Sequence, residues 1–457
     1  MPPFVALFAC LTFIAYLLYR EYSLNTKCSY ALWIPQLWFM ICLSRPVSMW
    51  LDPYNIITKM NTSGSTIDFI ISTILVLASV VVLSRRNINI SMILRNNVWI
   101  TVFYIYCGIS VFWSEFPFDL SIRFIKNICY LLPFLIVLTE KDRVEAINKL
   151  VRRSGIILIP LSFIFIKYFH EISRYYEAYT GKYYNAGVSY NKNGLGSLCL
   201  ICGLFYFWNI MDDLKNRNEP ENKKDFLTHF VIFIMTLWVM YLTDSATSST
   251  CLLVGIFIIS LTRFPVITKR YKAILMLLLF SVIIIYISDL YLLVFKAFTG
   301  KIGRDTTLTG RDTVWEVSLR GVSNQWIGSG YGGFWKQDKT IKIMNEIWDT
   351  PPNQAHNGYL DLYLNLGYIG VVIFFAMMLS AFREISRKII YYKDFGGFCV
   401  VYFIVFLLYN ITEAAFKDLH PLWNLFLLMA IDYKSIKGLR NNYLDEGFVP
   451  SRSGAMA

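Results

Sequence analysis

The side chains best suited to chemistry lie in one polar, tryptophan-rich stretch between two apolar runs, from Thr309 to Gly370. Within it, His356 stands in AHNGYLD and Arg311 in TGRDTVW. A histidine titrates near neutral pH and can take a proton from an attacking hydroxyl group. An arginine presents a planar fork of donors that suits phosphate oxygens. The pair predicts proton transfer beside a bound anion; a helix-capping histidine and a salt-bridged arginine are the alternatives.

Carboxylates could assist that histidine. Glu413, in NITEAAF, could orient the imidazole or act as the base itself, and a structural counter-charge is the alternative. Asp361 lies one turn after Asn357 and could fix a neighbouring cation. The hydroxyl residues that begin another apolar run are expected to cap a helix: Ser245, Ser249 and Thr250.

The elements that must hold these residues are membrane helices. Of 457 residues, 56% are hydrophobic and 16% are charged, far from the averages of soluble proteins. A bilayer core of roughly 30 Å requires about 20 apolar residues in a helix that satisfies its own backbone. The sequence therefore predicts an all-α polytopic membrane protein with about 12 to 14 transmembrane helices. The predicted spans lie near residues 3–19, 30–50, 67–83, 98–114, 120–138, 154–169, 194–211, 227–243, 250–262, 273–295, 358–380, 395–412 and 421–434.

Basic residues in the loops alternate between the two sides of the predicted membrane. Basic residues recur in the short loops 85–95, 141–153, 215–224, 263–272 and 383–393, which all fall on one side. This side is predicted to be cytoplasmic. The outer loops are then 114–119, 170–193, 244–249, 296–357 and 413–420. The amino terminus is expected outside, on a first helix that is retained because MPPF offers no basic signal-peptide segment.

Four regions follow from this topology. Residues 1–295 hold the first ten predicted helices, 296–357 form one large outer loop, 358–434 hold the last three helices, and 435–457 form a cytoplasmic tail expected to be disordered. Inside the large loop, Thr309 and Asp312 resemble a capping box. Apolar residues then recur at helical spacing and predict an amphipathic helix on the outer membrane interface: Val314, Trp315, Leu319, Val322 and Trp326.

Several cations should gather at the outer ends of the helices. Charged side chains within spans are costly and need partners or a function. Helices that run inward also begin there with the positive end of their dipole. The residues concerned are Arg45, Arg123, Lys126, Lys192 and Arg311. Together they predict an anion site. Its depth, at the outer face of the bilayer, favours a lipid-linked diphosphate. For each residue the alternative is snorkelling to the interface or an internal salt bridge.

Other classes of function fit less well. The net charge of +12 is spread over cytoplasmic loops, which argues against a nucleic-acid partner. The nine cysteines sit almost wholly in predicted helices, and Cys199 and Cys202 are expected to be packing residues. In the sequence we find no internal repeat and no pair of helices broken by glycine or proline, the usual signs of an inverted-repeat transporter. Of the other histidines, His229 is expected to pack or cap at an inner helix end, while His170 and His420 stand in weaker outer contexts.

The ordered motifs of this chain resemble the O-antigen ligase and polymerase superfamily, most nearly its exopolysaccharide polymerase branch. The motifs that carry the resemblance are SRPVSMWL (44–51), SYNKNGLG (189–196), LTGRDTVW (308–315), GSGYGGFW (328–335), AHNGYLDLYLNLGYIG (355–370) and NITE (410–413). One departure is that many relatives have a histidine where Tyr190 or Asn191 stands here. A role for a residue just before Lys192 is therefore doubtful.

The resemblance implies an inverting glycosyltransferase of the helical membrane type (GT-C), with no metal or other cofactor. Such enzymes use undecaprenyl-diphosphate-linked glycans on the periplasmic side of the bacterial inner membrane. By resemblance, Arg123 and Arg311 hold the diphosphate and His356 activates the acceptor. The position of Glu413 makes it the second expected catalytic residue. The expected binding residues are Arg45, Arg123, Lys126, Lys192, Asn193, Arg311, Tyr331 and Asn357.

The sequence leaves several functions open. Polymerisation of repeat units is favoured over ligation to lipid A core. The two reactions share a donor and differ in the acceptor, so ligation stays the alternative. The expected partners are the glycan donor, the glycan acceptor and membrane lipids, with a chain-length regulator as an open addition. A protein-glycosylating transferase, a lipid-linked oligosaccharide flippase and a structural scaffold are the further alternatives. A flippase should carry its charges through the membrane midplane rather than toward one face.

Overall fold

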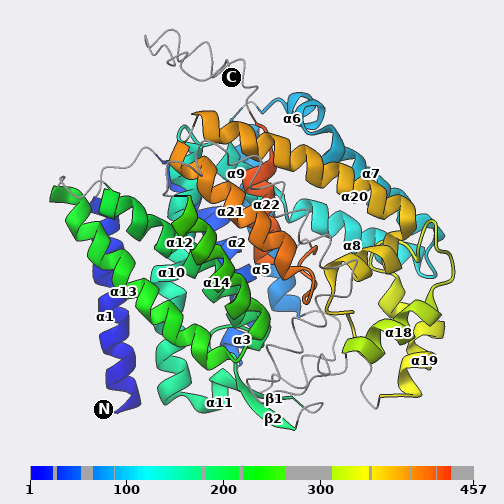
Figure 1. Cartoon of the computed structure of the whole chain (residues 1–457), viewed down its shortest axis with the longest axis horizontal. Coiled ribbons are helices and arrows are strands. Elements are labelled where there is room, and N and C mark those ends of the chain that lie inside the picture. Colours follow the sequence, from blue (N-terminus) through cyan, green and yellow to red (C-terminus); the bar gives the residue numbers. More distant parts are fainter. Residues whose placement is uncertain are drawn as a thin grey trace.

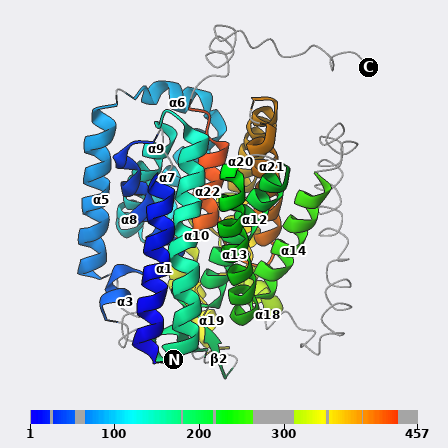
Figure 2. The same cartoon turned by 90° about the vertical axis from the view of Figure 1, so that its left-hand side faces the viewer.

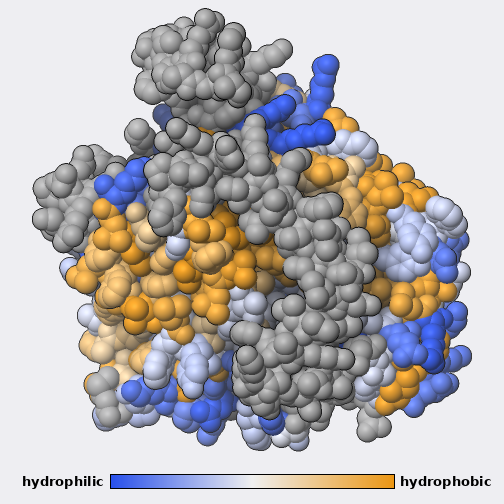
Figure 3. All heavy atoms as spheres, in the orientation of Figure 1, coloured by the Kyte–Doolittle hydropathy of each residue, from blue (hydrophilic) through white to orange (hydrophobic). Residues whose placement is uncertain are grey.

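The computed structural model of the chain describes residues 2–23, 28–52, 65–86, 88–177, 181–215, 220–262, 311–348, 352–391, 393–417 and 419–433. Most of the described backbone is helical, with one two-stranded sheet (Figure 1). On the face shown in Figure 3, apolar residues form a band with hydrophilic residues above and below it. A surface of this kind matches a bilayer and its two interfaces. The prediction of an all-α polytopic membrane protein is confirmed.

Six stretches of the described chain are helical, long and apolar enough to cross a bilayer. They are formed by α1 Pro3–Ser23, α5 Thr66–Ser84, α8 Pro117–Cys129 with α9 Leu132–Leu138, α12 Lys192–Lys215, α13 Pro220–Thr243 and α20 Gly358–Tyr391. The shorter apolar helices are η1 Tyr30–Leu32 with α2 Trp33–Leu43, α7 Val98–Ser110 with η3 Val111–Trp113, α14 Ala246–Leu261, α21 Lys393–Tyr409 and α22 Pro421–Ala430. The other described elements are α3 Val47–Leu51, α6 Ile90–Asn96, α10 Arg143–Tyr168, α11 His170–Ser173, β1 Arg174–Glu177, β2 Lys182–Asn185, α18 Arg311–Gly321, η4 Phe334–Lys336 and α19 Asp338–Asn345.

The predicted spans agree closely with these helices. Span 273–295 and the predicted tail 435–457 lie outside the described residues, and each of the other twelve spans overlaps a described helix. The span predicted over 30–50 is shorter in the structure, because α2 ends at Leu43. Pro46 explains this end, since proline disfavours helical conformation in the residue before it.

Two further boundaries differ for local reasons. The span predicted over 120–138 is divided between α8 and α9, and Pro133 stands in the first turn of α9. Proline suits the first turn of a helix, where its missing N–H would be unpaired in any case, so a new helix can begin there. The span predicted over 154–169 is the second half of α10. Asp142 starts this helix earlier, because its carboxylate accepts a hydrogen bond of 3.0 Å from the backbone N–H of Glu145.

The elements of the bundle lie between two distinct ends. In both views the hairpin of β1 and β2 lies toward the end where α1 begins, as do α3, α18 and α19 (Figures 1 and 2). The helix α6, which belongs to the predicted cytoplasmic loop 85–95, lies at the opposite end. The enclosed centre of the bundle includes α12, where Cys199 and Cys202 are buried and free, as expected of packing residues.

A helix follows Arg311, but it is shorter than the predicted apolar pattern. Val314 is buried in α18, whereas Leu319 is 51% exposed. The helix ends at Gly321, and Trp326 lies beyond it, where the Asn324 side chain accepts a hydrogen bond from its backbone N–H at 2.9 Å. The Thr309 and Asp312 capping box falls outside the described backbone and side chains. A position of α18 at a membrane interface stays a prediction.

The long helix α20 is interrupted at Gly367, a break that the sequence did not predict. Gly367 adopts φ 65° and ψ −169°, a conformation that only glycine reaches without strain. The loop that follows α18 fills the break: the backbone N–H groups of Tyr368 and Ile369 donate to the carbonyls of Gln325 and Trp326 at 2.9 and 3.1 Å. The break at Gly367 therefore lets the loop after α18 bond to the helix that follows His356.

Replacing Gly367 with alanine should break this anchor. A Cβ atom there would lie 2.4 Å from the Trp326 carbonyl, and the backbone strain alone is worth about 1–3 kcal/mol. We expect a lower thermal unfolding temperature in detergent and faster protease cleavage of the loop 322–330. Gly397→Ala is the control, since its nearest contact is a ring atom of Trp208 at 3.1 Å. Equal losses in the two variants would contradict the assigned role of Gly367.

Candidate functional site

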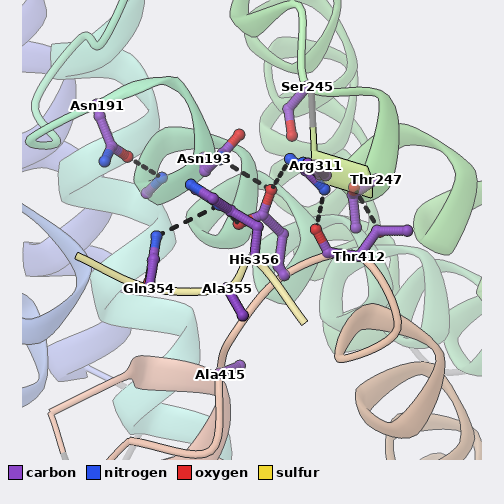
Figure 4. A network of polar contacts seen from close by, with 12 residues as sticks. Asn191, Asn193, Ser245, Thr247, Arg311, Gln354, Ala355, His356, Thr412 and Ala415 are labelled. Atoms are coloured by element: carbon purple, nitrogen blue, oxygen red, sulfur yellow. Dashed lines mark hydrogen bonds and ion pairs between the residues drawn. The ribbon is translucent and has the colours of Figure 1, made fainter. Parts of the chain in front are cut away.

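Four separate segments of the chain meet at Glu413. Figure 4 shows Asn193, Arg311, His356 and Thr412, one from each of these segments, gathered in one place. Glu413 lies between α21 and α22 and is 5% exposed. One carboxylate oxygen accepts hydrogen bonds from Asn193 Nδ2 at 2.9 Å and from Arg311 Nη2 at 2.8 Å. The other oxygen lies 3.2 Å from His356 Nδ1. The start of α12, the start of α18 and the loop before α20 thus converge on one buried carboxylate.

The surroundings of Glu413 keep it ionised despite its burial. Burial by itself raises the pKa of a carboxylate, but here the hydrogen bond from His356 and the charge of Arg311 outweigh it, so the pKa of Glu413 is lowered. A carboxylate saturated by three donors has little capacity left to take a further proton. Its arrangement is that of an orienting and charge-stabilising group.

His356 is held in an unusual backbone conformation that points its ring at Glu413. Its φ is 50°, uncommon for a residue other than glycine. The next segment is fixed by Gly358, whose N–H lies 2.8 Å from the Asn410 carbonyl and 3.0 Å from the Glu413 carbonyl. Strained residues that are over-determined by their surroundings often mark functional sites.

The contact with Glu413 also fixes which ring nitrogen of His356 can act. A carboxylate only accepts, so Nδ1 carries the proton, and the neutral ring then has an unprotonated Nε2. Gln354 Nε2 lies farther from Nδ1, at 3.4 Å. The His356 side chain is 32% exposed, and Nε2 has no hydrogen-bond partner in the described part of the chain. The ring can therefore accept a proton from an incoming hydroxyl group.

Arg311 links Glu413 to the neighbouring backbone. Its Nη1 donates to the Thr412 carbonyl and its Nη2 to Glu413, while the side chain is 18% exposed. A guanidinium has five N–H donors, so these two bonds leave donors available for an anion. Thr412 is itself bonded to Thr247 through the two hydroxyl groups at 2.8 Å. Asp305, six residues before Arg311 in the sequence and another candidate for a salt bridge with it, lies outside the described residues.

A second set of contacts fixes the loop in front of His356. Asp361 accepts hydrogen bonds from the backbone N–H of Ala355 at 3.0 Å and from Trp335 Nε1 at 2.9 Å. Its other oxygen lies 3.9 Å from Lys417 Nζ, which donates to Gln354 Oε1 at 2.6 Å. Asp361 is thus beside a cation, as the sequence suggested. Lys417 itself was missed, although it stands four residues after Glu413 in the same predicted outer loop.

Arg123 and Lys126 lie on α8 and are exposed. Neither forms a hydrogen bond or ion pair that joins it to Glu413 within the described residues. A Cβ atom on Gly332 would lie 3.8 Å from Arg123 Nη1, so Arg123 faces the GYGG turn, and its charge acts on Lys417. Lys126 Nζ lies 5.2 Å from the ring centre of Phe69 and lines a cavity of about 590 Å³.

The remaining predicted binding residues have structural contacts. Arg45 is 3% exposed and donates to the carbonyls of Ile172, Gly187 and Val188. The Tyr331 hydroxyl accepts a hydrogen bond from Asn127 Nδ2 at 3.2 Å on α8. Asn357 caps α20, since its side-chain oxygen accepts hydrogen bonds of 3.1 Å from the N–H groups of the second and third residues after it. These contacts leave the predicted ligand roles untested.

The other histidines have different surroundings. His229 lies 2.7 Å from Asp213 through Nδ1 and is buried between α12 and α13, as a packing residue would be. His420 caps α22 by accepting from the N–H of Leu422 at 3.3 Å, and burial lowers its pKa to about 3. Ser245 precedes α14, but its hydroxyl bonds Ser248 at 3.1 Å instead of the helix backbone, so the expected cap is wrong for this residue.

Comparison with known proteins supports the resemblance seen in the motifs. A family model described as O-Antigen ligase matches residues 230–375, a region that contains Arg311 and His356. Over 295 residues the chain is 23% identical to the exopolysaccharide production protein ExoQ of Rhizobium meliloti (strain 1021). That alignment covers 62% of this chain and 64% of ExoQ. Glu413 lies outside the matched family region, although it is bonded to both residues inside it.

Proposed function

We propose, on the premise that the chain belongs to the O-antigen ligase and polymerase-like family that it resembles, that it is a periplasm-facing inverting glycosyltransferase. It polymerises undecaprenyl-diphosphate-linked repeat units into O-antigen or exopolysaccharide, with the lipid diphosphate as leaving group. The supporting observation is the contact of His356, Arg311 and Glu413, which places a proton acceptor beside a fixed cation. A multi-pass location in the bacterial inner membrane is part of the proposal.

In the proposed reaction His356 Nε2 takes the proton from a hydroxyl group of the acceptor sugar. The oxygen then attacks the anomeric carbon of the donor from the face opposite the diphosphate, and the bond to the diphosphate oxygen breaks. Glu413 stabilises the imidazolium that forms, because its carboxylate already holds Nδ1. Arg311, together with Arg123 and Lys417, compensates the charge that collects on the departing diphosphate. Metal independence stays a prediction from the family.

Ligation of the glycan to lipid A core is the second candidate. The matched family description names an O-antigen ligase, whereas the relative is described as an exopolysaccharide production protein. Both reactions require the same donor, and the acceptor decides between them. Purified protein given only lipid-diphosphate repeat units should lengthen them if it is a polymerase. A requirement for added lipid A core would favour a ligase.

The same assay tests the role of Arg311. Arg311→Ala should lower the initial rate by about 10²-fold or more, comparable to the loss of one donor to a developing anion. Arg311→Lys is the matched control, which keeps the charge and loses the fork, and it should retain an intermediate rate. In cells, loss of polymer with lipid-linked single units accumulating outside supports an enzyme. Accumulation on the cytoplasmic side would instead support a flippase, and no effect would support a scaffold.

A further inference from the structure

The β1 and β2 hairpin carries two cross-strand pairs of tyrosines, one on each face. The antiparallel register sets Tyr175 opposite Tyr184 and Tyr176 opposite Tyr183. Because side chains alternate along a strand, the two pairs point in opposite directions. Tyr176 and Tyr183 are 54% and 73% exposed, and their ring centres are 5.2 Å apart. The outer face of the hairpin therefore presents two adjacent aromatic rings to the surroundings.

The inner face of the same hairpin contacts the candidate site. Lys192 Nζ lies 3.5 Å from the ring centre of Tyr184, and the backbone N–H of Lys192 donates to the Tyr175 hydroxyl at 3.5 Å. The next residue is Asn193, which donates to Glu413. The outer tyrosine pair is thus connected to the catalytic carboxylate through one strand pair and one helix start.

Contacts at its base hold the hairpin in place. Arg45 binds three backbone carbonyls, one just before β1 and two just after β2. Asn185 Nδ2 donates to the Leu242 carbonyl at 2.9 Å, which ties β2 to the end of α13. These bonds give Arg45 a positioning role. Because they already fix the hairpin, a ligand that binds the two rings loses less free energy to ordering the backbone.

We propose that Tyr176 and Tyr183 form a glycan subsite, at the place where the sugar chain leaves the candidate site. This inference rests on the proposed function. Exposed tyrosine rings offer a large, stiff surface for the C–H faces of sugar rings, and their hydroxyl groups can bond sugar hydroxyls. Arg174, which is exposed, lies on the same face of the hairpin as the pair, and the exposed Lys182 precedes Tyr183 in the chain. Charged neighbours suit a hydrated glycan better than the hydrocarbon region of a bilayer.

An aromatic belt at the membrane interface is the competing explanation, since tyrosine is enriched there. Tyr241 separates the two. It is 78% exposed near the end of α13, next to Leu242, and it is not part of the hairpin. If the hairpin rings serve as a belt, Tyr176→Ala with Tyr183→Ala should resemble Tyr241→Ala and lower only the stability of the protein in the membrane.

The test uses the full chain in lipid nanodiscs with lipid-diphosphate repeat units isolated from cells that make this polymer. For the double variant Tyr176→Ala, Tyr183→Ala we expect a KM for the repeat unit about 10-fold higher if the rings hold the incoming glycan. If they hold the growing glycan, we expect shorter products. The variant with phenylalanine at both positions keeps the stacking surface, so its KM and product length should stay close to those of the wild type. Tyr241→Ala should change neither KM nor product length.

The outcomes distinguish the subsite from the proposed function. A higher KM or shorter products, at an unchanged unfolding temperature, would support the subsite. An unchanged KM and product length, with or without a loss of stability like that of Tyr241→Ala, overturns it. If the wild-type chain makes no product from the same substrate while remaining folded, the proposed function itself fails.

Discussion

Replacing His356 with alanine is expected to lower the initial rate of glycan transfer by about 10²–10⁴-fold, the usual contribution of a positioned general base. The expectation rests on geometry: Nδ1 is held by Glu413 at 3.2 Å, and Nε2 is left to accept a proton. The rate is measured with the purified chain and lipid-diphosphate repeat units at a saturating concentration. Because the side chain is 32% exposed, its truncation should cost little stability.

The control for this variant is His170→Ala, which removes an exposed histidine at the start of α11. It should retain the wild-type rate and the same unfolding temperature. His356→Gln keeps a polar side chain that can bond Glu413 but cannot accept a proton from the acceptor, and it should be as inactive as His356→Ala. A His356→Ala rate within a few-fold of wild type, with the protein folded, would remove the base from the proposed mechanism.

Much of the fold could be predicted because lipid imposes a simple rule on the sequence. A helix of apolar residues satisfies its own backbone, so length and hydropathy located twelve of the thirteen spans within the described residues. The break at Gly367 was not predictable in the same way. At this break, the carbonyls of Gln325 and Trp326 replace hydrogen-bond partners within the helix. Such a contact joins distant segments of the chain, so the only sign of it in the local sequence is the glycine.

The site was predicted in part for a similar reason. Residue type and membrane side singled out Arg311, His356 and Glu413. The family resemblance added Asn193, and the structure brings Asn193, Arg311 and His356 into direct contact with Glu413. The same reasoning cannot tell a ligand-binding cation from a structural one. Arg45 looked like the others in sequence, yet three carbonyls surround it. The partners of a side chain are set by tertiary contacts, and a position near a helix end does not reveal them.

Glu413 supplies the second large expected effect, because its removal acts on stability and chemistry together. Glu413→Ala leaves the Arg311 charge and the donors of Asn193 and His356 without their acceptor in a buried place. Breaking a buried pair in this way costs about 3–5 kcal/mol. We expect a marked fall in the unfolding temperature and no measurable transfer. Glu413→Gln keeps the shape and one oxygen acceptor, so it should be more stable than Glu413→Ala.

The double variant Arg311→Ala, Glu413→Ala decides whether this loss comes from an uncompensated charge. With the guanidinium also removed, no buried cation is left unpaired, so the double variant should be more stable than Glu413→Ala alone. Transfer should remain absent, since both the orienting carboxylate and the cation are missing. Strictly additive losses of stability would show that the two side chains act independently, in contradiction to their 2.8 Å contact.

For the rate of transfer, the double variant Glu413→Gln, His356→Ala should be no slower than His356→Ala alone, because an orienting group has no effect once the base is gone.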